Sequence, residues 1–249
     1  MKQGPGSGGQ RDLFGLPPFA QGYAYEPDFL SVAEEASLLG VMRELPLAEA
    51  KYKEYRAKRR VVSYGGRFDY DSNTLNEAAP IPEFLQPLRT RVAAWANIPA
   101  EQFNHALVAE YAAGVQLGWH RDVPDFEVVV GVSLLSACRM RFRRYSPIPL
   151  EQGTRPLGLR EEEPAQHGHG QRRPGRRAPV QPAPAGPPSA GRDKGLAIEL
   201  APRSIYRLQG EARWGWQHSV PPVPALRYSI TFRTLRVRSE REKQGDELR

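Results

Sequence analysis

The sequence predicts a mainly β protein with N-terminal helices (α+β), in which the helices precede an antiparallel sandwich or barrel. Two apolar stripes at helical spacing lie before residue 100. Beyond it, short β-branched and aromatic runs alternate with Gly and Pro, as in antiparallel β folds. These runs cover 103–111, 126–136, 138–145, 196–200, 204–208, 216–220 and 226–237. With 249 residues, the chain is long enough for one elaborated domain that buries a site.

The N-terminal third begins with a Gly- and Pro-rich stretch, residues 1–20, which we expect to be a disordered tail. The pattern "SVAEEASLLGVMREL" then predicts a helix, because Ser31 and Glu34 have the spacing of a capping box. Its apolar stripe consists of Leu38, Leu39, Val41, Met42 and Leu45. A second helix is expected over about 83–96, where the apolar positions are Phe84, Leu85, Leu88, Val92 and Trp95.

The segment between these helices, "KYKEYRAKRR" (51–60), carries six basic residues, one acid and two tyrosines. This mixture suits phosphates and unstacked bases, and it is equally compatible with the solvated face of a helix. The overall charge is less informative. Of the net +7, eight Lys or Arg against five acids in residues 151–195 account for +3.

Residues 151–195 contain no aromatic side chain, and 16 of these 45 residues are Gly or Pro. Such a segment cannot bury enough apolar surface to order itself, so we expect an insertion loop. The folded domain is then expected over 21–150 and 196–238, followed by a charged tail over 239–249.

The single cysteine, Cys138, excludes an intramolecular disulfide framework and a Cys₄ or Cys₂His₂ zinc site. We interpret it as a small buried hydrophobe in a reducing compartment. The N-terminal "MKQGPGSGGQ" lacks the apolar region of a signal peptide, and no run approaches the roughly 18 apolar residues that span a bilayer. We therefore expect a soluble cytoplasmic protein without a membrane partner.

The stretch "QLGWHRDVP" (116–124) contains His-Arg-Asp, which also opens the catalytic loop of protein kinases. That loop requires an Asn five residues after the Asp, but position 127 is Glu. The sequence also lacks a phosphate loop and an Asp-Phe-Gly motif. A kinase is therefore excluded.

A metal site is the stronger interpretation of this stretch. On a strand, His120 and Asp122 share one face and can converge on one ion. This H-x-D pair is a weak signal alone, and His218 in "WGWQHSVPP" is the candidate third ligand. Two histidines and one carboxylate form the facial triad of non-haem Fe(II) proteins.

The segment "RYSITFR" (227–233) adds a second signal. With a period of two, one face carries Arg227, Ser229, Thr231 and Arg233, and the other is hydrophobic. Two arginines that point into a barrel interior require anions, and a dicarboxylate ligand would supply them. If the polar face points to solvent, the pattern is only an amphipathic strand.

Taken together, these motifs resemble the signature of AlkB-like Fe(II)/2-oxoglutarate-dependent dioxygenases. The resemblance rests on the H-x-D pair, the distal His218, and the two arginines that follow it at a spacing of R-x₅-R. It extends to "FNHALVAEYAAG" before the H-x-D pair, to "RRVVSYGGRFDY" (59–70) and to "RFRR" (141–144). In all, it covers about 25–150 and 196–236.

The resemblance implies roles for individual residues. It implies that His120, Asp122 and His218 bind Fe(II). Residues implied for the cosubstrate 2-oxoglutarate are Arg227 at its distal carboxylate, Arg233 at the metal-proximal end, Tyr111 and Ser229. The chain departs from the family's Asn-x-Tyr pattern, since Ala109 stands in place of the Asn. One polar contact to the cosubstrate is therefore missing or supplied elsewhere.

The resemblance also implies a fold and a chemistry. The fold is a double-stranded β-helix (jelly roll), with helices and a substrate lid at about 25–100 and a core at about 101–150 plus 196–238. The chemistry couples oxidative decarboxylation of 2-oxoglutarate by O₂ to hydroxylation of a C–H bond. On an N-methylated base, this releases formaldehyde and the repaired base.

Nucleic acid is the expected partner, as a single strand or a flipped base, and we expect a monomer. Candidate substrate-binding residues are Tyr64, Phe68, Tyr70, Trp119 and Asp125. Arg139, Arg141 and Arg143 share one face of their expected strand, where they could follow phosphates or be solvated. Two alternatives stay open: the same chemistry on proteins or small molecules, and a non-catalytic nucleic-acid-binding module that retains the fold.

Overall fold

A computed structural model describes five segments of the chain, and the fold is built from these alone. They are residues 20–52, 55–69, 74–76, 78–146 and 196–237. The expected insertion loop, the charged tail and nearly all of the expected N-terminal tail lie outside the described residues. Within the described residues, no helix is long and apolar enough to cross a membrane.

Two antiparallel sheets form the β core, as predicted, and with the few helices they confirm the fold class. The seven-stranded major sheet has the order β1-β11-β8-β13-β6-β3-β2, and the four-stranded minor sheet has the order β10-β9-β12-β7. The major-sheet strands are β1 (Ala24–Glu26), β2 (Ala48–Tyr52), β3 (Tyr55–Tyr64), β6 (Phe103–Tyr111), β8 (Phe126–Leu134), β11 (Ile205–Leu208) and β13 (Arg227–Leu235). The minor-sheet strands are β7 (Leu117–His120), β9 (Cys138–Arg144), β10 (Leu196–Leu200) and β12 (Trp216–Val220).

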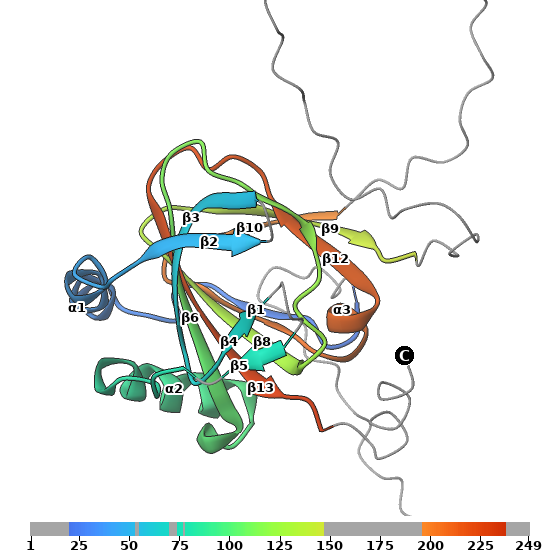
Figure 1. The fold of residues 1–249 in the computed structure, drawn as a ribbon, viewed down its shortest axis with the longest axis horizontal. Coiled ribbons are helices and arrows are strands. Elements are labelled where there is room, and N and C mark those ends of the chain that lie inside the picture. Colours follow the sequence, from blue (N-terminus) through green and yellow to red (C-terminus); the bar gives the residue numbers. More distant parts are fainter. Residues whose placement is uncertain (1–19, 53–54, 70–73, 77, 147–195, 238–249) are drawn as a thin grey trace, which may run out of the picture. The chain divides into compact units, whose positions relative to one another are not determined.

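The helices lie against the side of the major sheet that faces away from the minor sheet (Figure 1). They are α1 (Val32–Met42) and α2 (Gln86–Ala96), with short 3₁₀ turns η1 (Glu83–Leu85) and η2 (Ala100–Gln102) beside α2. A separate apolar cluster fills the space between the two sheets. A third helix, α3 (Gly210–Trp214), leads directly into β12. The layers are therefore helices, major sheet and minor sheet.

The capping box predicted at the start of α1 is present. The Ser31 hydroxyl accepts from the Glu34 backbone N–H at 3.2 Å, and the Glu34 carboxylate accepts from the Ser31 N–H at 2.7 Å. The predicted stripe is correct for Leu39 and Met42, which are buried, but Val41 is 42% exposed. The helix ends at Met42, so it is shorter than the predicted 15-residue segment.

The basic tract at 51–60 is not helical, and the alternative of a solvated helix face was wrong. This part of the chain forms β2 and β3, which pair in an antiparallel hairpin. Strand β3 also pairs with β6, with Arg60 opposite Glu110 and Val61 opposite Ala109. The structure contains a further hairpin that we did not predict, β4 (Arg67–Asp69) with β5 (Thr74–Asn76).

The register of β13 determines which side chains face the space between the sheets. Its neighbours are β6 and β8, and Arg227 lies opposite Tyr111, Ser229 opposite Ala109, and Arg233 opposite His105. Because side chains alternate along a strand, the polar face of "RYSITFR" points inward with these partners. All four of its polar side chains are buried, so the solvent-facing alternative does not apply.

Candidate active site

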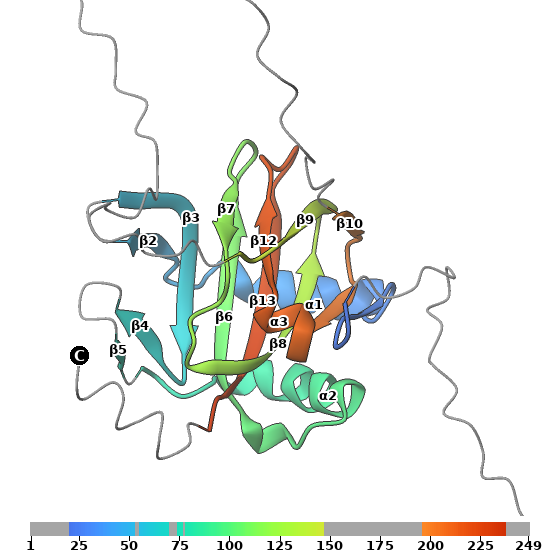
Figure 2. The same ribbon diagram turned by 90° about the vertical axis from the view of Figure 1, so that its right-hand side faces the viewer.

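Three potential metal ligands meet at the end of the minor sheet. His218 on β12 lies directly opposite His120 on β7, and Asp122 follows two residues after His120. The ligand atoms of these three residues lie within 4.8 Å of one another. Figure 2 shows β7 and β12 side by side, which explains how residues 98 positions apart in the sequence converge.

The protonation states of these residues suit a divalent cation. Burial, assisted by the neighbouring His120, lowers the pKa of His218 to about 3. Burial also lowers the pKa of His120, whose Nδ1 lies 2.9 Å from the Gly118 carbonyl oxygen and donates to it. Each imidazole is thus neutral, and His120 presents Nε2 as a ligand atom. Two imidazoles and one carboxylate fit Fe(II).

Asp122 is held in its ionised form by cationic neighbours. Burial alone would raise its pKa, but the guanidinium charges of Arg233 and Arg213 hold the pKa far below its usual range. Arg233 donates to Oδ1 through Nε at 2.8 Å and through Nη2 at 2.7 Å. The other oxygen, Oδ2, lies 3.7 Å from His218 Nε2 and stays available to a metal.

Arg213 on α3 fixes the turn that carries Asp122. Its Nη2 donates to the backbone carbonyls of Asp122, Val123 and Phe126 at 3.0, 2.8 and 3.0 Å. The side chain is 2% exposed, so these bonds form away from solvent. Sequence reasoning missed this residue, because nothing in the local pattern shows that a helix residue 91 positions later reaches this turn.

Arg227 and Tyr111, which are register partners on β13 and β6, also face the space between the two sheets. Arg227 is 2% exposed, donates from Nη2 to Ser133 Oγ at 3.3 Å, and lies 5.0 Å from the centroid of the Tyr111 ring. Its Nε is buried without a hydrogen-bond partner. Within the described residues, Arg227 makes no ion pair. A buried guanidinium with an unsatisfied donor fits a carboxylate ligand.

Arg59 and Tyr206 also belong to this group, and sequence reasoning missed both. Arg59 Nη1 donates to Tyr111 Oη at 3.3 Å, from the strand next to β6. Tyr206 is buried, and burial, together with the charge of Asp122, raises the pKa of its phenol. Arg59 lies within the basic tract, for which nucleic-acid binding and a solvated helix face were the two interpretations. Arg59 lies two residues before Val61, the register partner of Ala109, so it provides a polar group close to the place where the family's Asn is absent.

Two of the five predicted substrate-binding residues, Tyr64 and Trp119, do not face the space between the sheets. Tyr64 lies in the apolar cluster under the helices, which corrects the expectation that it contacts substrate. Trp119 precedes His120 and therefore faces the outer side of the minor sheet, so it does not form the pocket wall that we expected. Asp125 follows the metal-binding turn and is half-buried. Phe68 lies in β4, of whose side chains nothing is described, and Tyr70 lies outside the described residues.

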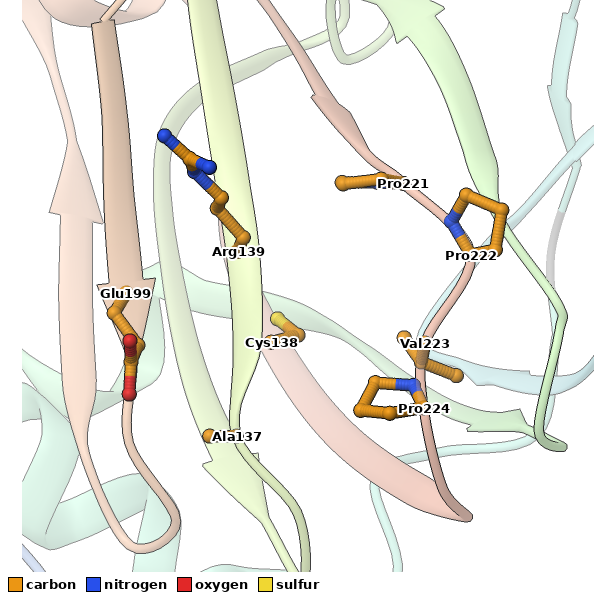
Figure 3. Close-up of a pocket in the computed structure, with 8 residues that line it drawn as sticks. All are labelled: Ala137, Cys138, Arg139, Glu199, Pro221, Pro222, Val223 and Pro224. Atoms are coloured by element: carbon orange, nitrogen blue, oxygen red, sulfur yellow. The ribbon is translucent and has the colours of Figure 1, made fainter.

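A separate hollow of about 260 Å³ lies between β9 and the loop that precedes β13 (Figure 3). Its lining residues are Ala137, Cys138, Arg139, Glu199, Pro221, Pro222, Val223 and Pro224. Cys138 is buried, as predicted, and burial raises the pKa of its thiol. The metal-ligand triad does not line this hollow.

Comparison with known families adds an independent finding. A model described as the 2OG-Fe(II) oxygenase superfamily matches residues 25–233. A curated relative from Arabidopsis thaliana, the "Alkylated DNA repair protein ALKBH8 homolog", is 29% identical over 204 residues. The alignment covers 78% of this chain and 49% of the relative, so the chain spans about half the length of that protein.

Among solved structures, the chain is similar to the structure titled "The structure of OsALKBH1". The similarity covers 88% of this chain and 99% of the other, with a TM-score of 0.54 and 14% sequence identity. At this level of identity, the match supports the jelly-roll fold alone.

Proposed function

Since the chain belongs to the 2OG-Fe(II) oxygenase superfamily, we propose that it removes alkyl groups from N-alkylated nucleic-acid bases. The superfamily and its AlkB-like relatives make the chain an Fe(II)- and 2-oxoglutarate-dependent dioxygenase. The more specific part of the proposal is that the substrate is an alkylated nucleic-acid base, and the printed name of the Arabidopsis relative supports it.

We assign two groups of residues between the sheets to two ligands, Fe(II) and 2-oxoglutarate. His120, Asp122 and His218 would hold Fe(II), and Arg233 would keep Asp122 ionised with Oδ2 directed at the metal. In the second group, the cosubstrate end, Arg227 would grip the distal carboxylate of 2-oxoglutarate, with Tyr111 and Ser229 beside it. The unsatisfied Nε of Arg227 is the observation that best supports this placement.

Fe(II) held by His120, Asp122 and His218 would supply the oxidation, in which O₂ and 2-oxoglutarate give succinate and CO₂ while a substrate C–H becomes C–OH. The protein's own residues position the reactants and exclude water from a cavity lined by buried side chains. On an N-methyl group, hydroxylation gives a hydroxymethyl group that falls apart to formaldehyde and the free base. This breakdown requires no protein general base, and the buried acid of the site, Asp122, is already bound to Arg233.

The observation that carries the proposal is the His120, Asp122 and His218 cluster, together with the buried Arg233 that pairs with Asp122 and the buried Arg227 on the same strand. To test it, the purified protein would be incubated with Fe(II), 2-oxoglutarate, ascorbate and methylated single-stranded DNA or RNA oligonucleotides. Formaldehyde release and a matching loss of methyl groups by mass spectrometry are expected. The His120→Ala variant should release none.

The same assay separates the remaining substrate classes. If oligonucleotides do not change the rate of succinate formation but peptides or small molecules raise it, the enzyme acts on those substrates instead. Absence of formaldehyde across both DNA and RNA panels, with succinate still formed, would refute the nucleic-acid assignment while leaving the oxygenase chemistry intact.

A further inference from the structure

The outer side of the minor sheet carries arginines for which the oxygenase chemistry has no role. Along β9, buried and outward-facing side chains alternate, and Figure 3 shows Cys138 directed toward the proline loop and Arg139 away from it. The buried residues are Cys138, Met140 and Phe142. We use the term arginine face for the outward set, which consists of Arg139, Arg141 and Arg143 with Trp119 and Gln217.

Neutral groups hold two of these arginines in place. Arg141 donates from Nε to Ser219 Oγ at 3.1 Å, and Arg143 donates from Nε to Gln217 Oε1 at 2.8 Å. Their guanidinium carbons lie 5.2 and 4.5 Å from the centroid of the Trp119 ring. The terminal Nη atoms of both arginines form no hydrogen bond within the described part of the chain. The donors that remain are therefore positioned in advance and available.

The arginine face also lacks a counter-ion among the described residues. None of its three arginines forms an ion pair, although Glu199 is the register partner of Arg139 on β10. Arg144, the next residue of the same strand, does form an ion pair, with Glu211 at 3.3 Å. Three unpaired charges on one rigid strand favour a polyanionic partner.

The arginine face lies directly behind the metal site. Trp119 precedes His120 on β7, and Gln217 precedes His218 on β12, so the same two strands carry the metal ligands on their inner side. Strand β7 is the edge of the minor sheet. A flexible chain bound to the outer side can therefore pass around this edge toward the metal.

We propose that the arginine face binds the phosphate backbone of the single-stranded nucleic acid whose base is processed, a step that rests on the proposed function. Alternate residues of a strand are about 7 Å apart, and each guanidinium fork fits one phosphate. The indole of Trp119 offers a stacking surface for a neighbouring base. The arginine face thereby positions nucleotides that flank the reacting base, while the inner cavity receives the base itself.

The test measures binding apart from chemistry. Metal-free protein and unmethylated, fluorescently labelled single-stranded DNA and RNA are titrated by anisotropy at several salt concentrations. The variant R139Q/R141Q/R143Q should bind at least about tenfold more weakly at 0.1 M salt, and the slope of log affinity against log salt should fall by about 2, since each single-strand phosphate contact contributes about 0.7. Each single variant should lower the slope by about 0.7.

A control variant, R43Q/R89Q/R91Q, removes the same charge from the C-cap of α1 and from α2, on the far side of the major sheet. It should leave the salt slope unchanged. An equal loss in both triple variants would show only a net-charge effect and would overturn the proposal. The proposal would also be overturned if polyglutamate or anionic vesicles bound tightly and the arginine-face substitutions weakened that binding as much as they weaken nucleic-acid binding. If the triple variant unfolds, as judged by circular dichroism, the three single variants decide.

The outcomes for the arginine face and for the proposed function are separable. Slope changes in the variants with no formaldehyde release by the wild type support the arginine face and refute base dealkylation. Formaldehyde release by the wild type, with unchanged binding and an unchanged KM for oligonucleotides in the triple variant, refutes the arginine face alone.

Discussion

At the scale of single residues, Tyr111 is the most strongly constrained group of the cosubstrate end. Burial would raise the pKa of its phenol, but Arg59 and Arg227 outweigh burial and lower it. Their guanidinium carbons lie 5.8 and 5.0 Å from the ring centroid, and they come from the two strands on either side of β6. Two cations around one phenol leave positive charge that a ligand carboxylate would neutralise.

Arg59 is therefore expected to contribute to cosubstrate binding. Arg59→Met should raise the KM for 2-oxoglutarate by about tenfold, since a hydrogen bond to a charged group contributes about 1.5–3 kcal/mol, with little change in kcat. Succinate formation against 2-oxoglutarate concentration measures both constants. Arg60→Met is the matched control, because the Arg60 side chain pairs with Glu110 instead of Tyr111. A fall in kcat at an unchanged KM would contradict this role.

His105 provides a prediction of pH dependence. Burial, together with the charge of Arg233, lowers its pKa to about 3, and its Nδ1 accepts from Arg233 Nη1 at 3.4 Å. The ordinary pKa is 6.5, so as the pH falls the unfolded chain takes up a proton on His105 at a higher pH than the folded chain does. Stability is therefore lost as the pH falls from 6.5 toward 3. In His105→Gln, the free energy of unfolding should depend less on pH over this range, by up to about 1.4 kcal/mol per pH unit.

Urea unfolding of the metal-free protein at several pH values, with EDTA present, measures this dependence. His120 and His218 also have lowered pKa values, so the wild-type and variant curves should both decline and only their slopes should differ. Parallel curves for the two proteins would mean that His105 is already protonated in the folded state.

At the scale of elements, the sequence was informative wherever a strand has two chemically different faces. The period of two in β13 predicted that its arginines share one face and left open whether that face points inward, and the structure places it inward. The alternation of β9 predicted that Arg139, Arg141 and Arg143 share one face, as they do. The hairpin of β2 and β3 could not be predicted in this way, because its charges obscure the period of two. The contacts of Arg213 and Tyr206 arise from tertiary structure, so no local pattern indicates them.

One packing contact between strands is testable. A Cβ atom on Gly131 of β8 would lie 2.3 Å from the ring of Tyr206 on β11. The ring has little room to move, since Tyr206 is 7% exposed. Gly131→Ala should lower the free energy of unfolding by about 1–3 kcal/mol and raise the KM for 2-oxoglutarate, because the displaced phenol enters or leaves the cosubstrate end.

Urea denaturation and succinate kinetics measure these two effects. Gly40→Ala in α1 is the control, since its Cβ meets nothing within 4 Å, and it should be neutral or stabilising by up to about 1 kcal/mol. Combining Gly131→Ala with Tyr206→Leu should recover much of the lost stability. If Gly131→Ala alone proves harmless, the ring of Tyr206 is free to move, and the close contact has no functional consequence.

At the scale of the whole molecule, strands from both sides of residues 147–195 complete one sheet. Leu196 on β10 lies opposite Phe142 on β9, and the pairing runs on to Leu200 opposite Cys138. Tyr145, just beyond β9, donates its N–H to the Gly215 carbonyl at 2.9 Å. The strand ends that flank this segment are therefore adjacent, and a short turn can join them.

We expect the domain to retain its fold when a six-residue Gly/Ser linker replaces residues 147–195. Shortening a 49-residue connection to six removes about three doublings of loop length, which favours folding by about 2 kcal/mol. The shortened chain should unfold at an equal or higher urea concentration and keep its KM for 2-oxoglutarate, because the cosubstrate-binding residues lie on strands that the linker does not touch. Lower stability or a raised KM would show that residues 147–195 make contacts on which the domain depends, and the interpretation of this segment as an insertion loop would then fail.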